Sequence, residues 1–160
     1  DAATRFNGAP YVHQVSEVAR AGIVIDPASR TIWNSQNTAI RRELIPAWGM
    51  IPFVGRMDDI YASLIVQRVM RERGMRVHFG KPYVYQQRNA HNLVRDLRNE
   101  IDGYENVERL AALLDSIVLP GKNVIGDCRA IWATLNHVDF IPGRAVSAMS
   151  AYIDDCEAVL

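Results

Sequence analysis

Two adjacent carboxylates stand at the start of the best-marked helix in this sequence. Asp58 and Asp59 follow Gly55 and Arg56, and the glycine permits a sharp turn before the helix begins. A carboxylate at the mouth of an anchored helix can accept a proton from a substrate hydroxyl or orient that hydroxyl. The same residues also suit a structural role, because aspartate caps helices and its charge favours a helix N-terminus. Both interpretations stay open, since capping alone explains the residue types.

A polar run between a predicted strand and a predicted helix is the second candidate site. Residues 86–92 include six polar side chains, among them Gln86, Arg88 and His91. Ligands bind at the carboxyl ends of strands in open α/β sheets, and a guanidinium is a common partner of phosphate. We therefore expect Arg88 to contact an anionic group. The alternative is an ordinary loop that ends in a helix cap at Asn92.

A third polar run, residues 34–38, lies between apolar flanks and contains Asn37. These residue types favour a solvated loop. Amide groups that touch a polar ligand are the alternative interpretation.

Apolar spacing predicts the elements that must position these residues. A buried stripe predicts a helix from Asp58 to Gly74, formed by Ala62, Ile65, Val66, Val69 and Met70. Upstream we expect a hairpin of residues 23–25 and 31–33, and a short helix at 40–44 that Pro46 ends. Downstream we expect strands at 76–79 and 82–85 and then a short helix, whose apolar stripe is Leu93, Val94, Leu97 and Ile101. Three further amphipathic segments predict a small antiparallel bundle, at residues 107–117, 124–135 and 146–156.

Composition limits the classes of function. The chain has 160 residues, enough for one domain with a core, and its 18 basic residues balance 18 acidic ones. No global field therefore favours nucleic acid, and no apolar run has the length of a membrane span. Because no signal-peptide pattern is present either, we expect a cytoplasmic protein. The two cysteines are expected to be reduced thiols, and the four histidines lack a metal-ligand spacing. The chain does not begin with methionine, so we expect a fragment or a processed form.

Three ordered segments carry a resemblance to a known family. They are residues 37–45, residues 55–62 and residues 80–85. They look like the C-terminal half of the reversibly glycosylated polypeptide family, the UDP-arabinopyranose mutases, and the related STELLO-like glycosyltransferases look similar across the same region. The resemblance covers roughly residues 34–100 and leaves out the helical tail.

This resemblance implies an α/β (α+β) segment, the C-terminal part of a GT-A nucleotide-sugar fold. We expect residues 1–104 to be half of a catalytic domain and residues 105–160 to be a helical tail packed on it. The Asp58–Asp59 pair would then match the acidic motif beneath the acceptor site. Arg56 would hold that motif or a diphosphate, and Asn37 would line the sugar pocket. A divalent metal, Mn²⁺ or Mg²⁺, is implied as cofactor.

The chain departs from the family pattern in its metal ligands. The Asp-x-Asp motif of the family occurs nowhere in this sequence, so the metal ligands are expected outside it, in a missing N-terminal half or a second chain. Our prediction is a glycosyltransferase that uses a nucleoside diphosphate sugar and a hydroxyl acceptor. The alternatives are a UDP-sugar mutase, or an interaction domain that self-associates through its helical tail.

Overall fold

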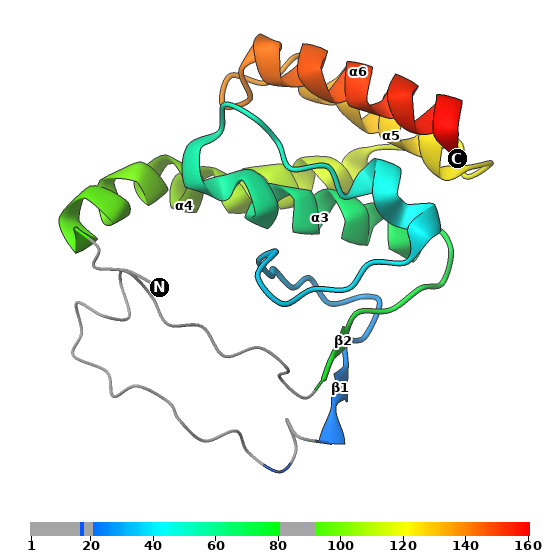
Figure 1. The fold of residues 1–160 in the computed structure, drawn as a ribbon, viewed down its shortest axis with the longest axis horizontal. Coiled ribbons are helices and arrows are strands. Elements are labelled where there is room, and N and C mark those ends of the chain that lie inside the picture. Colours follow the sequence, from blue (N-terminus) through cyan, green and yellow to red (C-terminus); the bar gives the residue numbers. More distant parts are fainter. Residues whose placement is uncertain (1–16, 18–20, 81–91) are drawn as a thin grey trace.

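The computed structural model describes residue 17, residues 21–80 and residues 92–160, which form a mainly helical body with one small β-ribbon (Figure 1). The elements in chain order are strand β1 (Ile23–Val24), the 3₁₀ helices η1 (Arg42–Ala47) and η2 (Gly55–Met57), helix α3 (Asp58–Arg71), strand β2 (His78–Phe79), and helices α4 (Leu93–Ser116), α5 (Val124–Leu135) and α6 (Gly143–Val159). The predicted α/β class, with one central helix followed by further helices, is confirmed.

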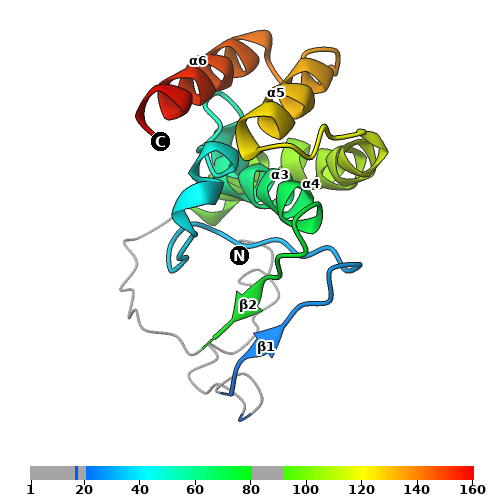
Figure 2. The same cartoon turned by 90° about the vertical axis from the view of Figure 1, so that its right-hand side faces the viewer.

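The elements are arranged in layers around α3. Helices α3 and α4 pack against each other, and α5 and α6 cover one side of this pair (Figures 1 and 2). The β-ribbon lies on the opposite side. Helix η1 contacts α3, α5 and α6 and so closes the core between the layers.

Helix α3 forms where the apolar stripe predicts it. All five stripe residues are buried, and Val66 and Val69 are fully enclosed. Gly74 follows the helix at a positive φ of 62°, and the Met75 N–H donates to the Met70 carbonyl across this turn. The glycine therefore ends the helix as predicted, because a left-handed residue after the last turn lets the chain satisfy its final carbonyls.

The predicted hairpin of residues 23–25 and 31–33 is wrong. The turn itself forms, since the Ser29 N–H donates to the Asp26 carbonyl at 2.9 Å. However, β1 pairs antiparallel with β2, with Ile23 opposite Phe79 and Val24 opposite His78. Residues 31–35 lie along α3 instead, where side chains of the helix accept their backbone N–H groups. The second expected strand, residues 82–85, falls outside the described residues.

Pro46 does not end a helix but lies inside η1. The predicted helix at residues 40–44 is therefore displaced and is a 3₁₀ helix. A six-residue 3₁₀ segment has few hydrogen bonds to lose, and the buried Pro46 ring contributes to packing instead.

Helix α4 is one helix of 24 residues where the sequence predicted two. Gly103 lies inside it, and Met57 packs into the space that a side chain would occupy; a Cβ there would lie 2.4 Å from the Met57 sulfur. The predicted division between residues 104 and 105 falls inside this helix.

The predicted stripe on the first half of α4 is only partly right, since Leu93 and Leu97 are half-buried. Val94 and Ile101 are 49% and 42% exposed, whereas Asp96 and Glu100 on the same helix are buried. Arg56 lies against these two carboxylates, so the inward face of this half of α4 carries an ion-pair cluster.

The stripes of the last three helical segments are confirmed. Leu110 and Leu114 of α4, Ile131 and Leu135 of α5, and Ile153 of α6 are fully buried. Cys128 and Cys156 are both buried free thiols, as predicted. Among the residues that the structure describes, no helix combines the length and the apolar character that crossing a membrane requires.

Candidate active site

Asp58 is the first residue of α3 and is half-buried. The N-cap is Met57, which offers no side-chain hydrogen bond, so the prediction that Asp58 is the capping residue is off by one position. Its carboxylate nevertheless accepts a first-turn N–H: the backbone N–H of Asp59 donates to Asp58 Oδ1 at 2.9 Å. Within the described part of the chain no cation forms an ion pair with Asp58. One carboxylate oxygen is thus left for another donor.

Asp59 is engaged differently. Its Oδ2 accepts two hydrogen bonds from Ser35, one from the backbone N–H at 2.8 Å and one from the hydroxyl at 3.0 Å. These bonds hold the polar run 34–38 against the first turn of α3. The structure therefore brings together two segments that the sequence singled out separately, the run that contains Asn37 and the aspartate pair.

The polar run has its own internal hydrogen bonds. The Gln36 N–H donates to Asn34 Oδ1 at 3.2 Å, and the Thr38 hydroxyl donates to the Asn34 carbonyl at 2.6 Å. Asn37 sits at the tip between them and is exposed. Its amide makes no hydrogen bond within the described residues. The loop is thus fixed by Asn34 and Ser35, while Asn37 stays available to a ligand.

Arg56 faces α4. Its Nε donates to Glu100 Oε1 at 2.8 Å, and its Nη1 lies 3.7 Å from Asp96 Oδ1. The Arg56 side chain is 40% exposed, whereas the side chains of Asp96 and Glu100 are only about a tenth exposed. Of the two roles expected for Arg56, these contacts favour holding the motif over binding a diphosphate, since a phosphate would compete with two buried carboxylates.

Asp96 and Glu100 were not singled out by the sequence reasoning. Their spacing of four residues places them on one helix face, and that spacing was the available signal. The neighbouring apolar residues Val94 and Ile101 suggested that the other face was the buried one, which obscured it.

Three predicted site residues, Gln86, Arg88 and His91, lie outside the described residues. The helix cap that was the alternative for this region is confirmed, because the side chain of Asn92 accepts the N–H of Arg95 at 3.1 Å.

The described residues do not contain a cluster of three acidic, histidine or cysteine side chains suited to a metal ion. A divalent cation prefers several oxygen ligands, and here Asp59 is already committed to Ser35. The residues at the mouth of α3 therefore do not by themselves form a metal site.

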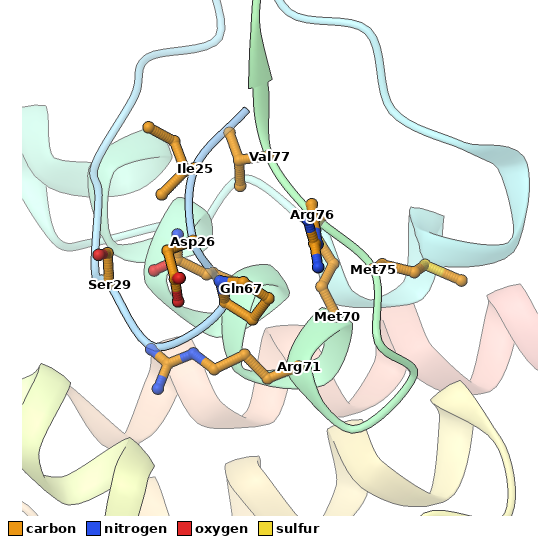
Figure 3. A pocket seen from close by; sticks show the side chains of 10 residues that line it. Ile25, Asp26, Ser29, Gln67, Met70, Arg71, Met75, Arg76 and Val77 are labelled. Carbon is orange, nitrogen blue, oxygen red and sulfur yellow. The ribbon is translucent and has the colours of Figure 1, made fainter. Parts of the chain in front are cut away.

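Two hollows lie away from this mouth. A cavity of about 10 Å³ near the C-terminal end of α3 has room for one water molecule at most (Figure 3). A groove of about 540 Å³ runs between α5 and α6 and is lined by Arg129, Trp132, Ala133, Asn136, Val146, Ser147, Ser150, Ile153 and Asp154. The cavity is too small for a sugar. None of the site residues predicted from the sequence lines the groove.

Asp115 of α4 binds two arginines, and one of them, Arg30, directly precedes the segment 31–35 that lies along α3. Arg30 donates to its Oδ2, and Arg71 Nη1 donates to its Oδ1 at 2.8 Å. Partial burial raises the pKa of Asp115. The hydrogen bond from Arg30 and the charge of Arg71 outweigh this effect and hold the pKa below its ordinary value of 3.8.

The lowered pKa of Asp115 predicts a pH effect on stability. A carboxyl whose pKa is lower in the folded state stabilises that state above its unfolded pKa and loses this contribution as pH falls through the folded pKa. We expect the urea midpoint of the native chain to fall more steeply below about pH 4 than that of Asp115→Asn. Asp139→Asn, at a pair that is largely exposed, is the control. Parallel curves for the native chain and Asp115→Asn would contradict the expectation.

The comparisons with known proteins address the family. Residues 56–159 match the family of STELLO glycosyltransferases, which is well over half of the chain. No curated protein matches the chain. The match begins at Arg56 and includes the aspartate pair, and it continues through α6. The expectation that the helical tail lies outside the resemblance is therefore wrong, whereas the resemblance to the UDP-arabinopyranose mutases stays a prediction. The chain belongs to the STELLO glycosyltransferase family.

Proposed function

We propose that this protein transfers a sugar from a nucleoside diphosphate sugar to a hydroxyl group of an acceptor, with the Asp58–Asp59 pair beside that hydroxyl. The observation that carries the proposal is the family match, which starts at Arg56 and so contains this pair at the mouth of α3. The geometry supports it, because Asp58 is not neutralised by an ion pair with any described cation and retains an oxygen for a further donor.

The proposed chemistry is a single displacement of diphosphate by an oxygen. The acceptor oxygen forms a bond to the anomeric carbon, and the bond between that carbon and the diphosphate oxygen breaks. The acceptor proton passes to a carboxylate, and the nucleoside diphosphate leaves with the electron pair. A carboxylate that accepts this proton contributes about 10²- to 10⁴-fold to the rate.

The other predicted residues keep proposed roles. Arg56 holds η2 on α4 and so fixes the approach to Asp58. Asn37 would contact sugar hydroxyls from the loop tip, and Arg88, with Gln86 and His91, would contact the diphosphate. A divalent metal, Mn²⁺ or Mg²⁺, would neutralise charge on the diphosphate, and its ligands would come largely from outside the described residues.

The test separates transfer from the alternatives. Full-length protein is titrated with UDP in the presence and absence of Mn²⁺ by calorimetry, and is then incubated with UDP-sugars with and without candidate hydroxyl acceptors. We expect metal-dependent binding and release of UDP that increases with acceptor. Conversion of the UDP-sugar into its ring isomer without an acceptor would indicate a mutase. Absence of both binding and turnover would favour an interaction domain that self-associates through α4–α6.

A further inference from the structure

Three polar side chains on one face of α3 accept hydrogen bonds from backbone N–H groups of residues 31–35. The N–H of Thr31 donates to Gln67 Oε1 at 3.2 Å, that of Trp33 to Ser63 Oγ at 3.3 Å, and that of Ser35 to Asp59 Oδ2 at 2.8 Å. We call Asp59, Ser63 and Gln67 the side-chain ladder. Every second residue of an extended segment is thereby paired with every fourth residue of a helix.

The two spacings match. Four residues of an α-helix rise about 6 Å, and two residues of an extended chain span about 6.6 Å. The helix therefore acts toward this segment as a neighbouring strand would. Ser63 and Gln67 are buried, so their oxygen atoms are fixed by the surrounding core. The ladder therefore fixes the register of the segment on α3 and places the loop 34–38 at the first turn of the helix.

Asp59 is the last member of the ladder and is the one that reaches the loop. Two donors from Ser35 converge on its Oδ2, so the Asp59 carboxylate could turn its other oxygen toward a substrate only by breaking its bonds to the loop. Asp58 accepts only one backbone N–H and is not held by any other described element. The two carboxylates therefore have different surroundings, although the sequence makes them look equivalent.

We infer that Asp59 is a positioning residue, which fixes the loop carrying Asn37 through Ser35, and that Asp58 alone takes the acceptor proton. This assignment rests on the proposed function. In it the side-chain ladder sets where the sugar-contacting loop lies relative to Asp58, and Asp59 acts through that loop and not on the acceptor proton.

Amide hydrogen exchange tests the ladder without any substrate. In the full chain, the N–H groups of Thr31, Trp33 and Ser35 should exchange slowly. Asp59→Ala should accelerate exchange at Ser35 and leave Thr31, which Gln67 holds, unchanged as an internal control. Fast exchange at Ser35 in the native chain would overturn the inference.

Kinetics of the full-length protein then separate positioning from catalysis. Asp59→Asn keeps an oxygen that can accept the Ser35 N–H, so we expect it to retain more than about a tenth of the native turnover. Asp59→Ala should mainly raise the KM for the nucleotide sugar, on the order of 10- to 100-fold. Ser35 is exposed, so Ser35→Ala is a second variant that should fold normally. It should raise the same KM about two- to tenfold.

The two possible failures are distinguishable. If Asp59→Asn loses turnover as completely as Asp58→Asn does, Asp59 is catalytic; the inference is overturned and the proposed function stands. If the native protein shows no acceptor-dependent transfer, the proposed function fails and the assignment fails with it. Retained turnover in Asp59→Asn together with the raised KM of Asp59→Ala supports the inference.

Discussion

Asp58→Asn is expected to lower the turnover of sugar transfer about 100-fold or more while leaving the protein folded. The substitution keeps the shape of the side chain and an oxygen that can accept the Asp59 N–H, which Asp58 Oδ1 now accepts at 2.9 Å. What it removes is the negative charge that, in the proposed function, takes the acceptor proton. The lost charge at the start of α3 should reduce the free energy of unfolding by only about 1 kcal/mol.

Asp155→Asn is the matched control for this substitution. Asp155 is an exposed aspartate of α6, far along the chain from the proposed site. The turnover of Asp155→Asn should therefore equal that of the native protein. Initial rates of product formation at saturating donor and acceptor measure the effect. If Asp58→Asn retains more than half of the native turnover, Asp58 has only the structural role that its helix position already explains.

Arg73→Ala is expected to destabilise the fold by about 3–5 kcal/mol. Arg73 follows α3, and its Nη1 lies 2.7 Å from Oδ2 of Asp127, a fully buried residue in the first turn of α5. The other oxygen of Asp127 accepts the Gly121 N–H at 2.8 Å. This carboxylate therefore joins the end of α3, the α4–α5 connection and α5. Removing Arg73 leaves a buried charge without its cation.

Two further variants distinguish an uncompensated charge from lost packing. Arg73→Met with Asp127→Leu removes both charges and should be much more stable than Arg73→Ala alone, because well-packed apolar pairs replace buried ion pairs at little cost. Arg41→Ala breaks an exposed pair with Glu43 and should cost less than about 1 kcal/mol. Urea unfolding at pH 7 measures all three. If Arg73→Ala lowers the free energy of unfolding by less than about 1 kcal/mol, the buried charge of Asp127 does not depend on Arg73.

The parts of the fold that local patterns determine were predictable. The stripe and the terminal Gly74 placed α3, and Asn92 marked the start of α4, because periodicity and capping depend on neighbouring residues. The pairing of β1 with β2 was not predictable in this way, since Ile23 and Phe79 are far apart in the sequence. A turn at residues 26–29 suggested a local hairpin, and tertiary contacts to α3 decided otherwise.

The candidate site shows the same division. The sequence pointed to Asp58, Asp59 and the run containing Asn37, but it did not show that Ser35 joins them. It also could not reveal that Arg56 pairs with Glu100, because the apolar stripe was expected to be the face of α4 that turns to the core. Both contacts depend on which face of a helix is buried, and a single sequence gives that only when one face is consistently apolar.

The most direct test of the central claim is hydrogen exchange of the full-length protein with and without a nucleotide sugar, Mn²⁺ and an acceptor. The claim is that substrate binds at the mouth of α3. It predicts slower exchange on ligand addition in peptides that cover residues 34–38 and 55–61, with the α5–α6 groove around Trp132 unchanged. Slower exchange confined to that groove would contradict the claim and move the site to the helical layer of α5 and α6.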